Sequence, residues 1–170
     1  MDTEKSTDNQ ENKPTQLEML KQELHPNNVM SRSIGHGKNL AYISGEYTIR
    51  AANGIFGFGN WSHRVRNLKE VSNTEGKGKN DKTRFDSSYI AIVAITATME
   101  DGKIAEYEDV GYGSGISYVD IGTAIESASK EAITDAMKRA LRHFGSQFGN
   151  SLYNEKFRKI ISKARSDLNI

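Results

Sequence analysis

Residues 87–112 read SSYIAIVAITATMEDGKIAEYEDVGY, and this stretch decides the fold. Its first half, 87–99, is rich in β-branched residues, a composition that favours a long β-strand. Asp101-Gly102 favours a type I′ turn, because both central residues of that turn need a positive φ. The segment IAEYEDVGY then predicts a returning strand. The sequence therefore predicts an antiparallel hairpin here rather than a βαβ unit.

Two helices and a short strand are predicted near the start of the chain. LEMLKQEL at 17–24 places leucines on one helical stripe, and Pro26 ends that helix. Tyr42-Ile43 predicts a short strand. EYTIRAANGIF at 46–56 has the spacing of a second helix, which the glycine-rich GFGN stops.

The segment between this helix and the hairpin predicts a third strand. WSHRVRNLKEV at 61–71 alternates between two faces, with Arg64 and Arg66 on the same face. The polar, glycine-containing stretch 72–84 predicts a mobile loop.

A long helix is predicted after the hairpin. GYGSG at 111–115 predicts a loop; Thr123 and Glu126 have the spacing of a capping box, and Gly145 is placed to end the helix. A short helix is predicted at 153–166. The fold class is therefore α+β: a three-stranded antiparallel β-meander packed by a long α-helix, a β-β-β-α core.

The composition suits a single domain and excludes several classes of site. Residues 2–16 contain no apolar side chain, so we expect a disordered polar tail over 1–16 and one domain over 17–170, including the short C-terminal helix. The chain has no cysteine and its histidines lack ligand-like spacing, so we predict no metal and no cofactor. The longest apolar run, 90–95, is too short for a membrane helix, so no membrane partner is expected.

Charge is distributed unevenly along the chain. The net charge is only +1, which argues against a uniformly basic nucleic-acid binder. Residues 130–170, however, carry nine Lys and Arg against four Asp and Glu, whereas 100–109 carry five acids and one Lys. This asymmetry predicts a polarised surface.

The stretch KEAITDAMKRALRHFG at 130–145 predicts a helix with one apolar and one basic face. The apolar sector, expected to pack on the sheet, comprises Ile133, Ala136, Met137, Ala140, Leu141 and Phe144. The basic sector comprises Lys138, Arg139, Arg142 and His143. One interpretation is a solvated face, since Asp135 precedes Arg139 by four residues and cations favour a helix C-terminus.

The other interpretation is a groove for a polyanion. Arg64, Arg66 and Arg50 supply further cations that could share such a groove, as single-strand binding requires. Aromatic residues that could stack on bases are Phe58, Trp61 and Tyr112, each of which could equally pack in the core or a turn.

An acidic cluster leaves a further function open. On a strand, Glu106 and Glu108 share one face while Asp109 points away. The cluster is compatible with three interpretations: the metal site of a nuclease, an exposed strand face, or a contact with the basic helix of a neighbouring copy. Three strands and a basic final helix are also compatible with a double-stranded RNA module. No phosphate-binding GxxxxGK[ST] motif is present.

Two longer blocks carry a resemblance to a known family. EDVGYGSG at 108–115 followed by KEAITDAMKRALRHFGSQFGNSLYN at 130–154 closely resembles the signature of the Rad52 family of single-strand annealing proteins, and YISGEYTIRAANGIFGFGNW at 42–61 resembles its strand–helix–turn block. The resemblance runs from about residue 17 to 157. It implies that the core assembles into an oligomeric ring with single-stranded DNA in a basic groove, and that complementary strands are paired without nucleotide hydrolysis.

The resemblance also implies site residues. Lys138, Arg139 and Arg142 occupy the family's KRxxR positions and would contact phosphates, and Phe58 stands at the aromatic of the FG-aromatic turn. Tyr47 replaces a usual cation, for which Arg50 would compensate. The full set of DNA-binding residues expected from the sequence is Lys138, Arg139, Arg142, Phe58, Arg50, Tyr47, Arg64, Arg66 and Lys103, with no catalytic residue.

Departures from the family limit what is expected. Glu100 stands where members often carry Lys, with Lys103 just beyond, and Val119 and Ile121 stand where lysines follow GYG, which argues against a second, outer DNA surface. Relatives bind recombinase and single-strand-binding protein through a long tail, whereas this chain stops at Ile170. This argues against a mediator role and leaves binding to other recombination proteins open.

The expected function is therefore non-enzymatic. The chain would bind single-stranded DNA and further copies of itself, and anneal strands in the nucleus, or in a bacterial cytoplasm if a virus encodes it. The alternatives are a double-stranded RNA-binding module and a metal-dependent nuclease.

Overall fold

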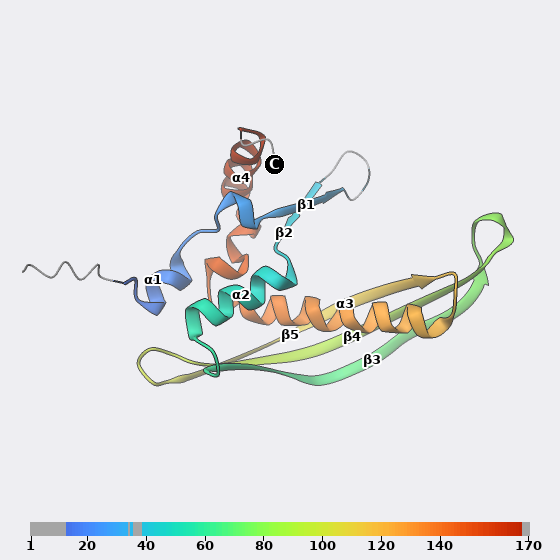
Figure 1. Ribbon diagram of the computed structural model, residues 1–170, viewed down its shortest axis with the longest axis horizontal. Helices are drawn as coiled ribbons and strands as arrows, with labels where there is room; N and C mark the ends of the chain where they lie inside the picture. Colours follow the sequence, from blue (N-terminus) through green and yellow to red (C-terminus); the bar gives the residue numbers. More distant parts are fainter. Residues whose placement is uncertain (1–12, 34, 36–38, 168–170) are drawn as a thin grey trace, which may run out of the picture.

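The computed structural model describes residues 13–33, 35 and 39–167. Three antiparallel strands form a sheet, and helix α3, Ile121–Arg142, lies along one of its faces (Figure 1). The other helices and a small hairpin gather near the C-terminal end of α3, while the far end of the sheet extends away from them (Figure 1). The predicted α+β meander packed by a long helix is confirmed.

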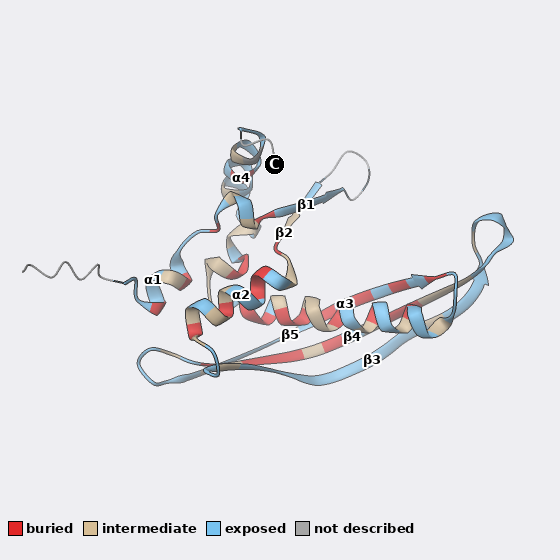
Figure 2. Cartoon of the chain, in the orientation of Figure 1, coloured by how far each residue is buried: buried red, intermediate tan, exposed pale blue. Residues whose placement is uncertain are grey.

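The sheet has the order β3-β4-β5, with β3 at Trp61–Lys77, β4 at Thr83–Thr98 and β5 at Ile104–Ser117. The loop predicted over 72–84 is wrong at both ends, because 72–77 continue β3 and 83–84 begin β4, with which they pair. Polar side chains stabilise this pairing, since the hydroxyl oxygens of Ser72 and Ser88 lie 2.7 Å apart across the strands. The polar composition of 72–77 reflects exposure to solvent and not a loop, because β3 is exposed along nearly its whole length (Figure 2).

The turn between β4 and β5 is longer than the sequence predicts. The N–H of Met99 donates to the carbonyl of Lys103 at 2.7 Å, which leaves three residues in the loop. Gly102 has a φ of 81°, whereas Asp101 has no positive φ, so the predicted type I′ turn is wrong. The geometry is that of a three-residue hairpin loop with glycine in its left-handed position.

The glycines of GYGSG lie inside β5 rather than in the predicted loop. A Cβ on Gly111 would lie 2.1 Å from the backbone nitrogen of Ala136, and one on Gly113 would lie 2.1 Å from the carbonyl oxygen of Ala128. The facing residues of α3 are fully buried alanines at four-residue intervals: Ala124, Ala128, Ala132, Ala136 and Ala140. Glycine is therefore required here for close helix–sheet packing and not for a turn.

The apolar face of α3 is as predicted, but its ends differ. Ala136, Met137, Ala140 and Leu141 are buried, with Ile133 and Phe144 packed against them. The N-cap is Asp120, whose Oδ1 accepts from the N–H of Thr123 at 2.7 Å, so the predicted Thr123–Glu126 capping box is wrong. Glu126 instead pairs with Lys130.

Gly145 does not cap the helix either. The helix ends at Arg142 and its C-cap is His143. A Cβ on Gly145 would lie 2.3 Å from the carbonyl oxygen of Leu20, so glycine allows the chain to pass close to the first helix.

The elements around the end of α3 form a second layer. They are α1 (Gln16–Lys21), η1 (Pro26–Asn28), β1 (Met30–Ser33), β2 (Asn39–Tyr42), α2 (Gly45–Phe56), η3 (Ser146–Phe148), η4 (Asn150–Tyr153) and α4 (Glu155–Asp167). Of the short strand predicted at Tyr42-Ile43, only Tyr42 lies in a strand, as the last residue of β2. β2 pairs with β1 in a hairpin that the sequence pattern did not predict. A small core of Leu24, Val29, Ile43, Tyr47 and Ile161 joins this hairpin to α2 and α4.

Most of the predicted polar tail lies outside the described residues, which begin at 13. Within them, the Thr15 hydroxyl accepts from the N–H of Glu18 at 3.2 Å and caps α1. The first helix therefore begins at Gln16, one residue earlier than predicted, and Gln16 is buried.

Candidate nucleic-acid interface

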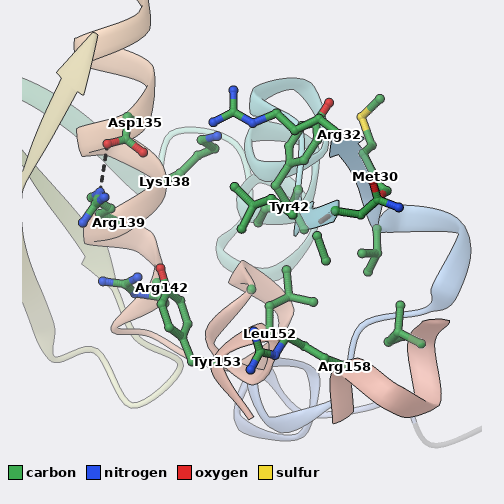
Figure 3. Close-up of a pocket in the computed structure, with 18 of the residues that line it drawn as sticks. Met30, Arg32, Tyr42, Asp135, Lys138, Arg139, Arg142, Leu152, Tyr153 and Arg158 are labelled. Carbon is green, nitrogen blue, oxygen red and sulfur yellow. Dashed lines mark hydrogen bonds and ion pairs between the residues drawn. The ribbon is translucent and has the colours of Figure 1, made fainter. Parts of the chain in front are cut away.

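A groove of about 1500 Å³ separates the C-terminal half of α3 from the β1–β2 hairpin, η4 and α4 (Figure 3). One wall is basic and helical, with Lys138, Arg139 and Arg142. The opposite side carries cations from other elements, Arg32 on β1 together with Arg158 and Lys159 on α4. Tyrosines of the lining are Tyr42, Tyr112 and Tyr153.

The groove arises because α3 turns its alanines to the sheet. Because that face is buried, Lys138, Arg139 and Arg142 lie on the other side of the helix. There they face the β1–β2 hairpin and η4 across the groove. Of the predicted basic sector, Lys138, Arg139 and Arg142 lie together on this wall, whereas His143 is not among the lining residues and lies 3.3 Å from Asp109.

Lys138 is a partly buried cation in the wall of the groove. Its Nζ lies 5.9 Å from the centre of the Tyr42 ring. Burial lowers the pKa of Lys138, and the charge of Arg32 lowers it further, whereas Asp135 acts in the opposite direction. A partly buried cation whose charged form is disfavoured gains from a nearby anion.

The two arginines are each held by a carboxylate. Arg139 donates from Nε to Oδ2 of Asp135 at 2.8 Å, so the i,i+4 pair expected for a solvated face is present. Arg142 donates to Oδ2 of Asp109 at 3.4 Å, and its guanidinium lies 4.6 Å from the centre of the Tyr153 ring. Carboxylates of the same chain thus neutralise part of the positive charge of the groove.

Asp109 pairs with the basic helix of its own chain. Its Oδ2 also lies 3.3 Å from Nε2 of His143, whose ring stacks on Tyr107. A contact between this acid and the helix of a neighbouring copy is therefore not needed to balance its charge.

The other predicted cations do not line the groove. Arg66 lies on the sheet, 3.0 Å from Glu106 and 3.7 Å from Glu108. Arg64 pairs with Ala94 on β4, so the two side chains share one face of the sheet. The residues on either side of Ala94 pack against α3, so Arg64 lies on the sheet face away from that helix.

The remaining predicted residues lie at two further places. Lys103 pairs with Asp101 at 2.6 Å in the β4–β5 turn, and Phe58 is 85% exposed in the connection between α2 and β3, at that same end of the sheet. Arg50 pairs with Glu46 at 3.3 Å on α2.

Tyr47 is buried beside the groove rather than open to it. It is 7% exposed, and its hydroxyl donates to Oε1 of Gln147 at 2.7 Å. Burial raises its pKa.

Of the aromatics considered for stacking, Trp61 packs on the core and donates to Asn53 at 2.8 Å. Tyr112 borders the groove through its backbone N–H, which donates to Asp135 at 3.3 Å, and its side chain shares the sheet face opposite α3 with its partner Ile90.

Sequence reasoning missed the side of the groove formed by the hairpin, η4 and α4, with Arg32, Tyr42, Tyr153, Arg158 and Lys159. Tyr153 lies in SLYN, at the end of the longer block that resembles the family, so the sequence offered a signal for this residue. Arg32 and Tyr42 carried none, because only the unpredicted β1–β2 hairpin brings them opposite α3.

The nuclease alternative finds little support in the acidic cluster. Glu106 accepts from Thr96 at 2.9 Å, and this hydrogen bond, together with Arg66, lowers its pKa. Within the described ranges, no three His, Cys, Asp or Glu side chains gather as metal ligands. Over the same residues, no helix is both long and apolar enough to cross a bilayer.

Comparison with known proteins shows one family whose matching segment contains every residue that lines the groove. Residues 13–169 match the family described as Rad52/22 family double-strand break repair protein. The DNA repair and recombination protein rti1 of Schizosaccharomyces pombe is 38% identical over 162 residues, which are 95% of this chain and 41% of that protein. RAD52 of Eremothecium gossypii is 39% identical over 80% of this chain and 29% of its own length.

A third relative, rad22 of Schizosaccharomyces pombe, is 36% identical over 86% of this chain and 30% of its own length. The chain therefore spans less than half the length of these curated relatives.

Proposed function

This chain belongs to the Rad52/22 family of double-strand break repair proteins, and we propose that it binds single-stranded DNA in the groove beside α3 and anneals complementary strands in recombinational DNA repair. Its relatives are named DNA repair and recombination proteins, which supports a role in recombinational DNA repair. The observation that carries the proposal is the convergence of Lys138, Arg139 and Arg142 on one wall of a groove whose opposite wall is also basic.

The proposed activity makes and breaks no covalent bond. Cations along a single strand neutralise phosphates, which reduces the repulsion between two strands that are to pair. Tyr153, 68% exposed, offers a face on which bases can stack without regard to sequence. Bases that stay accessible can then meet a complementary strand.

Assembly into a ring is part of the proposal. One groove of this size holds only a few nucleotides, so a continuous path for DNA requires several copies side by side. The sheet face opposite α3 supports self-association, because it leaves the apolar side chains of Ile90, Val110 and Ile116 exposed. Electron microscopy of the purified protein tests the ring, and strictly monomeric particles with and without oligonucleotide would contradict it.

The groove itself is tested by charge removal. Arg139→Ala with Arg142→Ala should weaken oligo-dT binding and flatten the log–log salt dependence by about 0.7 for each phosphate that is no longer neutralised. The matched control removes the same charge in Lys79→Ala with Lys82→Ala, in the β3–β4 turn at the far end of the sheet (Figure 1). Equal binding and annealing by the groove variant and wild type would refute the assignment.

The same binding experiments separate the alternatives. Tighter binding to duplex RNA than to single-stranded DNA would favour an RNA module, and magnesium-dependent cleavage abolished in Glu106→Ala would favour a nuclease. Since the relatives are fungal DNA repair proteins, we expect this chain to act in the nucleus.

A further inference from the structure

One carboxylate oxygen beside the groove lies against two side chains that can both carry a positive charge. Oδ2 of Asp109, on β5, is 3.4 Å from a terminal guanidinium nitrogen of Arg142 and 3.3 Å from Nε2 of His143, the C-cap of α3. The other oxygen, Oδ1, accepts from the N–H of Val110 at 2.7 Å. Arg142 and His143 therefore share one oxygen of the same acid.

The His143 ring is held in position for this contact. It stacks on the ring of Tyr107, with the ring centres 5.5 Å apart, and Tyr107 in turn packs edge-on against Phe144 at 4.8 Å. The His143 side chain is 46% exposed, so it exchanges protons with solvent. The charged and titratable groups around His143 and its carboxylate are Asp109 and Tyr107 on β5, and Arg139 and Arg142 on α3.

Protonation of His143 strengthens its contact with Asp109. Histidine side chains change charge between about pH 5 and pH 8. A protonated ring carries a hydrogen on both nitrogens, so Nε2 donates a charge-assisted hydrogen bond to Oδ2, whereas a neutral ring has only one such hydrogen and no charge. The carbonyl groups at the end of α3 also favour a cation at this position.

We propose that His143 is a positioning residue: in its protonated form it pairs with Asp109 and so releases Arg142 to bind a phosphate. This inference rests on the proposed function, since it names how pH regulates binding in the same groove. When Arg142 turns to a phosphate, the carboxylate of Asp109, 22% exposed, loses one partner. Charged His143 compensates for that loss, whereas neutral His143 leaves a partly buried carboxylate poorly paired, which costs free energy.

DNA binding should therefore be linked to the uptake of a proton by His143. The complex holds this proton more firmly than the free protein does, so affinity for single-stranded DNA rises as pH falls through the range in which histidine titrates. We expect affinity about two- to fivefold higher at about pH 5.5 than at about pH 8, the scale of one partly exposed ion pair.

The test is fluorescence anisotropy with oligo-dT at constant ionic strength between about pH 5.5 and pH 8. His143→Gln, which stays neutral, should lose the pH dependence and bind over the whole range about as wild type does at the alkaline end. Asp109→Asn should also lose it, although His143 still titrates, because the carboxylate that the two side chains share is gone. That variant should bind throughout about as wild type does at the acidic end.

The matched control is His63→Gln, which removes an exposed histidine of β3 that does not line the groove. It should keep the full pH dependence of wild type. Circular dichroism and particle size, measured at each pH, confirm that every variant folds and has the size of wild type.

The contrary outcomes are distinct. A wild-type pH dependence in His143→Gln would assign the titration elsewhere and overturn the inference. A dependence that persists in Asp109→Asn would mean that His143 acts on the phosphate itself, which also overturns it. Tight binding by wild type with no change across the range would remove the role of His143 and leave the proposed groove intact. Wild-type protein that binds no oligo-dT at any pH would reject the proposed function.

Discussion

Asp109 and Arg142 face each other across the interface between β5 and α3, with Oδ2 of the acid 3.4 Å from a terminal guanidinium nitrogen. Both side chains are only about a fifth exposed, at 22% and 20%. A carboxylate of the sheet therefore competes with any phosphate that approaches the last arginine of the helix. The same geometry positions Arg142 over Tyr153 before DNA arrives.

Removing the competing charge should strengthen DNA binding. Asp109→Asn is expected to raise affinity for oligo-dT about two- to fivefold, the equivalent of a pair worth about 0.5–1 kcal/mol. The asparagine carbonyl can still accept from the N–H of Val110, now 2.7 Å from Oδ1. Fluorescence anisotropy measures the gain, with Asp81→Asn in the distant β3–β4 turn as the control. Weaker binding by Asp109→Asn would show that the acid positions Arg142 rather than competing for it.

The aromatic partner of Arg142 should matter by its ring and not by its hydroxyl. Tyr153→Leu removes the ring face 4.6 Å from the guanidinium and one exposed stacking surface, and is expected to weaken oligo-dT binding at least threefold. Tyr153→Phe should bind within about twofold of wild type, because a phenyl face retains most of the attraction. Equally weakened binding in both variants would assign the effect to the hydroxyl instead.

Lys138 should make DNA binding depend on alkaline pH. Burial lowers its pKa below the ordinary 10.5, and a bound phosphate stabilises the ammonium, so the pKa rises in the complex. The complex then holds a proton more firmly than the free protein does, and affinity should fall as pH rises through the pKa of the free protein. The charged and titratable groups facing Lys138 are Asp135, Glu131, Arg139, Arg32 and Tyr42.

Titration of affinity in Lys138→Arg tests this assignment, because arginine stays protonated over the same range. The variant should lose the alkaline dependence while keeping most of its affinity at neutral pH. An unchanged dependence would assign the titration to another group.

The glycines of β5 should be essential for stability. Gly113→Ala places a Cβ 2.1 Å from the carbonyl oxygen of Ala128 and 2.3 Å from the backbone nitrogen of Ala132, so α3 must move away from the sheet. We expect the free energy of unfolding to fall by about 3 kcal/mol or more in urea denaturation. Gly76→Ala in β3, with no atom within 4 Å of the added Cβ, is the control and should change stability by less than about 1 kcal/mol. A destabilisation no larger at Gly113 than at Gly76 would mean that the helix can shift freely.

Local patterns predicted the main elements well. The β-branched run at 87–98 forms β4, and the 3.6-residue repeat from Ile133 to Phe144 separates the buried face of α3 from its basic face. Both patterns are short-range, because neighbours along a strand or one helical turn already determine which face a side chain occupies. Polar and glycine-rich stretches were misread at 72–77 and 111–115, since composition does not reveal what an opposing element requires.

The antiparallel sheet, the long helix and the grouping of Lys138, Arg139 and Arg142 follow from periodicity within single segments, so they could be predicted from local patterns. The positions of Arg32 and Tyr42 opposite Lys138, and of Arg64 and Arg66 on the sheet away from the groove, became known from the three-dimensional structure alone. This difference arises because a groove has two walls. The second wall depends on how the hairpin and α4 pack on α3, through contacts between residues far apart in the chain.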